Sequence, residues 1–145
     1  MEEIKILHLA DIKPAPLAAA PSREGGYMKR IIFPGNVDTK GVIFGYSEIE
    51  PGHSPHRWHN HKADKGPGFE IIYPENFEEV YHILSGSGTV QWKTPEGDIK
   101  EKKVGPGDTI FFPAGVAEHQ LLNTGTEKIT MVYCGSPIVS PKVSF

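Results

Sequence analysis

The chain has 145 residues with a formal net charge of -3, and 38% of the residues are hydrophobic and 23% charged. This length and composition predict one folded domain and argue against both a disordered chain and a pair of domains. The weakly acidic charge argues against a nucleic-acid partner, because binding to phosphates requires a basic surface, and we expect a small-molecule or protein partner instead.

The first residues carry no basic segment of the kind that begins a signal peptide, since Glu2 and Glu3 follow Met1 directly. No apolar run approaches the roughly 18 residues that a transmembrane helix needs. We therefore expect a cytoplasmic protein that makes no contact with a membrane.

The N-terminal part of the chain predicts an extended arm. Residues 13–26 are rich in Pro, Ala and Gly, a composition that disfavours helices and strands. We expect the arm to cover about residues 1–29 and to lie over the domain or across a neighbouring subunit. The core of the domain is then expected over about residues 30–136.

From Arg30 onward, short runs of β-branched and aromatic residues alternate with Gly, Pro, Asn and Asp, and no segment of ten residues has the apolar spacing of a helix. This pattern predicts an all-β sandwich or barrel. The expected strands are 41–49, 58–61, 80–84, 88–93, 99–104, 109–112, 119–123 and 128–134.

Two features of this pattern lead to further expectations. Residues 62–77 interrupt the strands and contain Gly66-Pro67-Gly68 before an apolar run, which predicts an extra hairpin or a lid. The one cysteine, Cys134, excludes an internal disulfide and a multi-cysteine zinc site. Its strand-like surroundings predict that its side chain is buried.

Four of the seven histidines lie between residues 53 and 61. A histidine-rich surface loop would have a similar sequence, but side chains two positions apart on a strand share a face, so His59 and His61 are placed to bind one ion. His56 has the opposite parity and His53 precedes a turn. We expect these two residues to contribute hydrogen bonds at the wall of a pocket rather than metal ligands.

Two motifs around these histidines resemble the signatures of the cupin superfamily. The first signature is a glycine, a His-x-His pair, a glutamate and a further glycine, and its positions are occupied by Gly52, His59, His61, Glu79 and Gly86. The second signature is a glycine, Pro-x-Gly, a histidine and an asparagine, and its positions are occupied by Gly107, Pro113, Gly115, His119 and Asn123. The chain departs from the first signature by placing 17 residues instead of three or four between the second histidine and the glutamate.

The resemblance implies a double-stranded β-helix (cupin or jelly-roll) barrel, commonly assembled as a homodimer, with one divalent transition metal ion in its mouth. The implied ligands are His59, His61, Glu79 and His119. Mixed nitrogen and oxygen donors suit Fe, Mn, Ni, Co or Zn, and a six-coordinate ion would keep two positions for water, substrate or dioxygen. If Glu79 does not bind, the remaining three histidines favour Zn.

The superfamily contains dioxygenases, decarboxylases, isomerases and binding modules, so the resemblance leaves the reaction open. Our leading expectation is an oxidoreductase of the dioxygenase type that acts on a small oxygen-bearing organic molecule. Acid or base help is expected from Tyr81, His56 or Glu70, with Glu75 as a further candidate. The inward aromatic residues that could line its pocket are Phe44, Tyr46, Tyr81, Trp92, Phe111 and Phe112.

Two alternatives stay open. One is a metal-dependent isomerase, lyase or decarboxylase, because cupin-type sugar-phosphate isomerases resemble this order of a histidine cluster, an acid, a tyrosine and a glycine. Its phosphate contacts would come from Arg57, Lys62 or Lys65. The other is a non-catalytic module that binds a small molecule or a metal.

Overall fold

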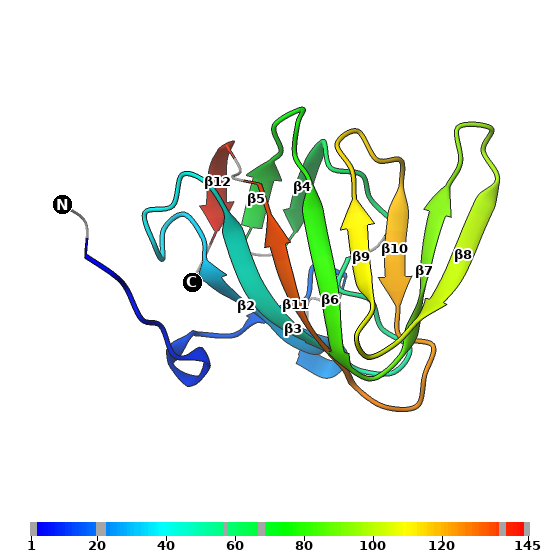
Figure 1. Ribbon diagram of the computed structural model, residues 1–145, viewed down its shortest axis with the longest axis horizontal. Helices are drawn as coiled ribbons and strands as arrows, with labels where there is room; N and C mark the ends of the chain where they lie inside the picture. The colour runs from blue at the N-terminus through cyan, green and yellow to red at the C-terminus, as the bar shows by residue number, and fades with distance from the viewer. Residues whose placement is uncertain (1–2, 20–22, 57, 67–68, 137–138, 144–145) are drawn as a thin grey trace.

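The computed structural model describes residues 3–19, 23–56, 58–66, 69–136 and 139–143, and its strands form three sheets (Figure 1). Short 3-10 helices occur at Leu9–Asp11 (η1) and Arg23–Gly25 (η2). In chain order, the strands are β1 (Ala15–Pro16), β2 (Gly26–Ile32), β3 (Ile43–Ile49), β4 (Ala63–Gly66), β5 (Phe69–Ile72), β6 (Glu79–Ser85), β7 (Gly88–Lys93), β8 (Ile99–Val104), β9 (Thr109–Phe112), β10 (His119–Leu122), β11 (Ile129–Gly135) and β12 (Val139–Val143).

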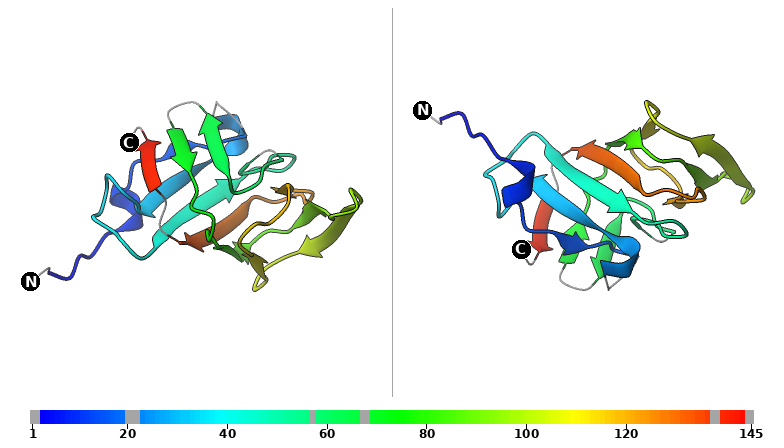
Figure 2. Two further views of the ribbon diagram at one scale, coloured as in Figure 1. Left: turned by 90° about the horizontal axis from the view of Figure 1, so that it is seen from above. Right: turned by 90° about the horizontal axis from the view of Figure 1, so that it is seen from below.

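The largest sheet has six strands in the order β1-β2-β3-β11-β6-β9, and the two smaller sheets have the orders β10-β7-β8 and β12-β5-β4. The two smaller sheets lie toward opposite ends of the molecule (Figures 1 and 2). Buried and half-buried residues alternate along β3, as expected for a sheet with one face toward the core. The all-β double-stranded β-helix predicted from the sequence is therefore confirmed.

Two apolar clusters hold the sheets together. The first joins the six-stranded sheet to β10-β7-β8, and Ile49, Ile83 and Leu121 are almost completely buried in it. The second joins the end of the six-stranded sheet to β5 through Phe77 and Ile71. Burying one such side chain contributes about 1.5–3 kcal/mol, so both clusters contribute to folding, and the histidines discussed below lie beside both.

Three predicted strands, at 88–93, 99–104 and 109–112, are confirmed with the same bounds. The predicted strand 58–61 is wrong, because this segment contributes only an isolated bridge between His59 and His119. In the 62–77 segment, β4 pairs antiparallel with β5. Of the two predicted possibilities, a hairpin or a lid, the structure shows the hairpin. On its other side, β5 pairs with β12 from the end of the chain, a pairing that was not predicted.

Two other expectations need correction. Residues 26–29 are not part of the arm, because they belong to β2, which pairs with both β1 and β3. Cys134 is exposed rather than buried, since its neighbours Met131, Tyr133 and Gly135 occupy the inward positions of β11. No helix in the described part of the chain has the length and apolar character needed to cross a membrane.

Candidate metal centre

Three histidines from two distant parts of the chain meet inside the barrel. The candidate ligand atoms of His59, His61 and His119 all lie within 4.8 Å of one another. The ring centroids are 4.5 Å apart for His59 and His119 and 4.8 Å apart for His61 and His119. The structure thus brings together the three histidines whose convergence the sequence predicted.

The main chain sets the spacing of two of these residues. The amide of His119 donates to the carbonyl of His59 over 2.9 Å, and the amide of His59 donates back over 3.2 Å. His119 begins β10 four residues after Gly115, a turn residue whose φ of +73° lies in the left-handed region. That turn brings the chain back so that His119 faces the 59–61 segment.

The hydrogen bonding of His119 leaves one ring nitrogen for an ion. Its Nδ1 lies 2.9 Å from the carbonyl oxygen of Ala117, which accepts a hydrogen bond from the protonated Nδ1 of a neutral ring. Nε2 is buried and has no hydrogen-bond partner among the described residues. Burial lowers the pKa of His119 to about 4, so the ring is neutral at neutral pH, as metal binding requires.

His61 is the most unusual of the three rings. Both of its nitrogens are buried without a hydrogen-bond partner in the described parts of the chain. Its ring packs against Phe77 and Phe112, with centroids 4.9 and 5.9 Å away. An unsatisfied buried polar group costs about 1–3 kcal/mol. A bound ion would remove this cost at one nitrogen, so the residues present fit a nitrogen-ligated transition metal.

Glu79 lies at the edge of the histidine cluster. It is the first residue of β6 and is buried, and its Oε1 lies 3.5 Å from Nε2 of His61. The carboxylate is close enough to join the coordination of an ion beside His61. The compact group of mutually close donors nevertheless consists of the three histidines alone.

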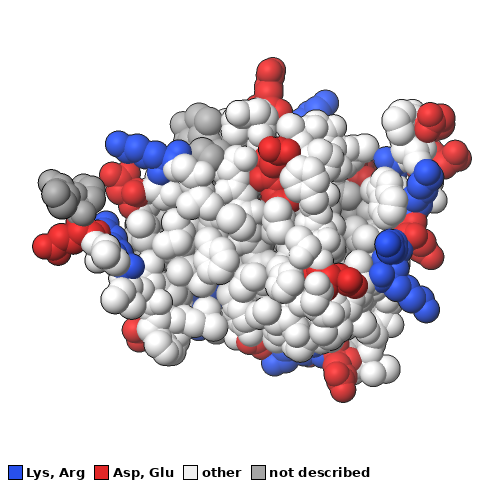
Figure 3. Space-filling view, viewed as in Figure 1, with Lys and Arg blue, Asp and Glu red and all other residues white. Residues whose placement is uncertain are grey.

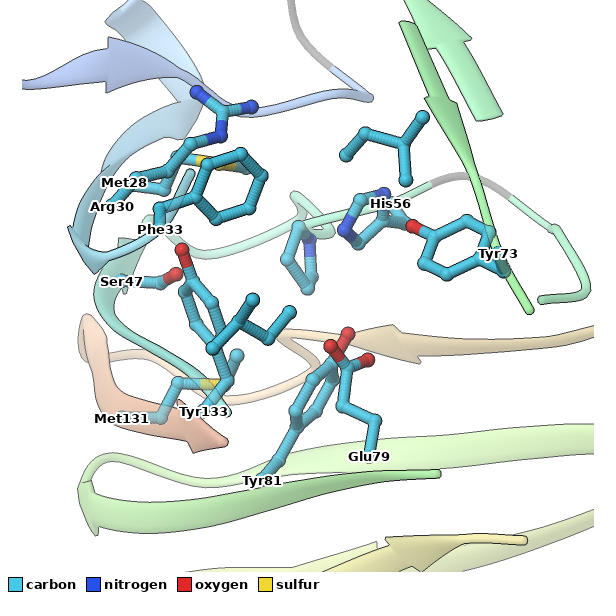
Figure 4. A pocket seen from close by; sticks show the side chains of 13 residues that line it. Met28, Arg30, Phe33, Ser47, His56, Tyr73, Glu79, Tyr81, Met131 and Tyr133 are labelled. Carbon is cyan, nitrogen blue, oxygen red and sulfur yellow. The ribbon is translucent and has the colours of Figure 1, made fainter. Parts of the chain in front are cut away.

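A small cavity of about 40 Å³, which we call the Glu79 cavity, adjoins Glu79, and its lining is mainly apolar. Figure 4 shows the side chains of Glu79 and Tyr81 pointing into it, with His56 on a neighbouring wall. Burial raises the pKa of Tyr81 well above its ordinary value of 10.0, and the Glu79 carboxylate raises it further. The Tyr81 hydroxyl is therefore protonated at neutral pH and can donate a hydrogen bond.

The same cavity contains residues that the sequence reasoning did not select. Arg30, Ser47 and Tyr133 line it from β2, β3 and β11. Arg30 is only 6% exposed and lies over the ring of Phe33, 5.5 Å from its centroid. The available signal was the alternation of apolar and polar residues along 26–32, which places Arg30 on the same face as Met28.

The other predicted site residues do not join this group. Ile71 lines the Glu79 cavity and Glu70 does not, because adjacent residues of β5 point to opposite faces. Arg57 and the side chain of Lys65 lie outside the described residues, and Lys62 is exposed.

The six predicted pocket aromatics divide between two faces. Tyr81, Trp92 and Phe112 line internal cavities. Phe44, Tyr46 and Phe111 occupy alternate positions on the opposite face of the six-stranded sheet, and Phe111 is 57% exposed. Strand parity therefore places only half of the predicted set inside.

Asn123, the last residue of the second motif, has a structural role. Its side-chain amide donates to the carbonyls of Ile49 and Glu127, each over 2.8 Å, and its oxygen accepts from the amide of Gly125. These three bonds fix the turn between β10 and β11 against the end of β3. The asparagine thus supports the strand that carries His119.

Comparisons with known proteins agree with this geometry. The family model described as "Cupin domain" matches residues 64–134. A glucose-6-phosphate isomerase from Thermococcus kodakarensis is 37% identical over 49 residues, which are 34% of this chain and 25% of that protein. The match therefore spans about a quarter of the length of this curated relative.

Two solved structures illustrate the similarity of fold. A predicted oxalate decarboxylase from Thermotoga maritima superposes with a TM-score of 0.65 at 19% identity, covering 92% of this chain and 99% of that one. A sugar phosphate isomerase of a cupin superfamily from Silicibacter pomeroyi superposes with a TM-score of 0.61 at 17% identity, covering 91% and 75%. Identities this low indicate a shared fold and leave the activity open. The two signature motifs, the double-stranded β-helix and the family match together show that the chain belongs to the cupin superfamily.

Proposed function

We propose that this protein is a mononuclear metal-dependent enzyme of the oxygenase type that acts on a small oxygen-bearing organic molecule. The observation that carries the proposal is the convergence of three imidazoles whose buried nitrogens include three without hydrogen bonds, two on His61 and one on His119. His59, His61 and His119 would hold the ion, with Glu79 as a fourth ligand. A divalent ion held there supplies Lewis-acid chemistry and, as Fe(II), activation of dioxygen.

The Glu79 cavity fits the dioxygen that an oxygenase uses. Its volume of about 40 Å³ suits a water molecule or a diatomic gas. Tyr81 and Tyr133 keep their protons because burial raises the pKa of both. They can therefore donate hydrogen bonds to an oxygen atom that enters the cavity, while Glu79 is placed to accept a proton.

The test begins with metal content. Elemental analysis of the purified protein, of His59→Ala and of His119→Ala should show one equivalent of metal in the native chain and a loss in both variants. His82→Ala is the matched control, because His82 is hydrogen-bonded to Thr109 on another face of the sheet. Unchanged metal content in the first two variants would refute the ligand assignment.

The reaction is then tested with Fe(II)-loaded protein in an oxygen electrode, against a panel of diketones, thiols, phenols and hydroxy acids. Oxygen uptake that depends on substrate and is lost in His119→Ala supports the proposal. Tight binding of panel members without turnover would instead indicate a non-catalytic binding module.

A second candidate is a metal-dependent isomerase, which is favoured by the 37% identity of 49 residues with a glucose-6-phosphate isomerase. In this alternative, Arg30 would contact an anionic group and Glu79 would move a proton between neighbouring carbons. An anaerobic assay of the metal-loaded protein with glucose 6-phosphate distinguishes the two, because an isomerase needs no dioxygen.

We also propose that the protein is a homodimer in which a second copy covers the outer face of the six-stranded sheet. Phe44, Cys134, Val80 and Phe111 are neighbours across four strands of this face. Figure 3 shows that most of this face carries neither acidic nor basic side chains. Such a continuous uncharged surface is typical of an interface.

Size-exclusion chromatography with light scattering tests the assembly. Val80→Lys should convert a dimer into a monomer, whereas Glu96→Lys, in the exposed turn between β7 and β8, should leave the mass unchanged. A native protein that is already monomeric contradicts this proposal.

A further inference from the structure

A cavity beside the histidine cluster lies where the barrel is not closed by hydrogen bonds. β8 is an edge strand of the sheet β10-β7-β8, and β9 is an edge strand of the six-stranded sheet. Residues of both strands line a cavity of about 420 Å³. We call this space the seam cavity. Its volume falls within the range of roughly 300–1,000 Å³ that small-molecule sites occupy.

The walls of the seam cavity are mainly apolar and partly aromatic. Val90 and Trp92 line it from β7, and Ile110 and Phe112 line it from β9. His119 also lines it, and the ring of Phe112 stacks on the ring of His119 with centroids 4.4 Å apart and planes 27° apart. The cavity therefore reaches the histidine cluster along an apolar wall.

Two basic side chains, those of Lys102 and Lys103, line the edge of this apolar space. Lys102 lines the cavity and has the same parity as Val104, the buried residue of β8, so it projects to the inward side. Among the residues that the structure describes, it has no ion pair or hydrogen bond. The nearby Asp108 is engaged with its own turn, where its carboxylate accepts from the amide of Gly105 over 2.7 Å.

The strand register gives the separation between this lysine and the metal centre. Lys102 pairs with Val90, and His119 pairs with Trp92. The two residues are thus two strands apart and two residues apart along the strands, which corresponds to about 12 Å between their Cα atoms. A ligand that reached both would have an anionic end and an apolar body a few carbon–carbon bonds long.

We propose that the seam cavity is the site of the organic substrate and that this substrate is an aryl or similarly planar carboxylate. Its carboxylate pairs with Lys102, and its apolar body lies between Trp92 and Phe112 and extends toward His119. The Glu79 cavity of about 40 Å³ then receives only water or dioxygen. The assignment of the bound molecule as substrate rests on the proposed function, whereas the binding site itself does not.

Trp92 provides a direct reporter for this proposal. The chain has two tryptophans, so Trp58→Phe leaves Trp92 as the one fluorophore of its kind. The probe is 4-phenylbutyrate, and the uncharged 4-phenyl-1-butanol is its partner of similar shape. We expect a saturable change in Trp92 emission with both probes and tighter binding of the carboxylate.

Two lysine variants separate the specific contact from general charge. Lys102→Met should weaken 4-phenylbutyrate about fivefold, as expected for a partly exposed ion pair, and should leave 4-phenyl-1-butanol unchanged. Lys100→Met is the control, because Lys100 lies on the same strand but does not line the cavity. Val116→Phe, which adds volume inside the cavity, should weaken both probes.

The proposal is overturned if Trp92 emission shows no saturable change, or if Lys102→Met and Lys100→Met behave alike. All titrations are run on metal-free and metal-loaded protein. If the chain takes up no metal but binds 4-phenylbutyrate in a Lys102-dependent way, the proposed function is refuted and the seam site stands. A chain that binds metal through its histidines but shows no Lys102 dependence would refute the seam site alone.

Discussion

Replacing His61 with leucine is expected to stabilise the metal-free protein and to destabilise the metal-loaded one. Both ring nitrogens of His61 are buried without hydrogen bonds in the described structure, and the side chain packs against Tyr73, Phe77 and Phe112. Each unsatisfied polar atom costs about 1–3 kcal/mol. An apolar side chain of similar volume removes that cost.

The size of the effect follows from these numbers. A gain of about 2 kcal/mol raises the melting temperature of a chain of this length by about 6 °C. With metal present at about a thousand times its dissociation constant, the native protein gains about 4 kcal/mol from binding. His61→Leu would lose most of that gain, so the order of the two melting temperatures reverses between the two conditions.

The assay is thermal unfolding followed by circular dichroism, in EDTA and with excess Fe(II), Ni(II) or Zn(II). His82→Leu is the matched control, because His82 is half-buried and hydrogen-bonded to Thr109. It should show no reversal. A lower melting temperature for His61→Leu in EDTA, or an equal metal-induced rise in His61→Leu and the native chain, would refute the reasoning.

Three further predictions concern stability. Asn123→Leu removes the side-chain amide that donates to the carbonyls of Ile49 and Glu127. The free energy of unfolding, measured in urea, should fall by about 2–4 kcal/mol. A loss under about 0.5 kcal/mol, as is usual for a surface substitution, would contradict this prediction. Gly86→Ala places a Cβ 2.3 Å from the Lys128 carbonyl oxygen, at a φ of +76°. It should therefore destabilise the protein more than Gly97→Ala, whose Cβ meets no neighbour at a φ of +91°. Equal losses of unfolding free energy in the two variants would refute the steric argument. Partial burial raises the pKa of Glu48, but hydrogen bonds from Lys128 and two tyrosines outweigh it and lower the pKa below 4.5. Glu48→Gln should therefore destabilise the protein at pH 7. The difference in unfolding free energy between the native chain and the variant should vanish as the pH falls through that lowered pKa. A constant difference down to the acid limit would show that the charge is not responsible.

The histidine cluster could be predicted from the sequence because its signal is local. His59 and His61 are separated by two positions, which keeps them on one side even though the segment forms a bridge rather than a full strand. His119 follows a Pro-x-Gly turn that fixes where the next strand begins. Both the spacing of His59 and His61 and the turn before His119 depend on the backbone geometry of a few consecutive residues, which can be predicted from the sequence.

Arg30 and Cys134 could not be placed in the same way. The inward direction of Arg30 depends on the pairing of β2 with β3, and a basic residue at an inward strand position contradicts the usual hydrophobic pattern. Cys134 lies in an apolar run whose two faces have similar composition, so parity could not be assigned without knowing which face meets the core. Both outcomes depend on contacts between segments far apart in the chain.

The paired amide–carbonyl bonds between residues 59 and 119 bear on which ions the site accepts. They lock two of the three donors to a common backbone frame, so their separation changes little when surrounding side chains are exchanged. Adjustment to cations of different radius would then be left to His61, whose ring is held by aromatic packing and by the contact with Glu79, and to that carboxylate itself. The packing of Phe77 and Phe112 against the His61 ring would therefore limit how far this ring can shift, and with it the range of ionic radii that the site can bind.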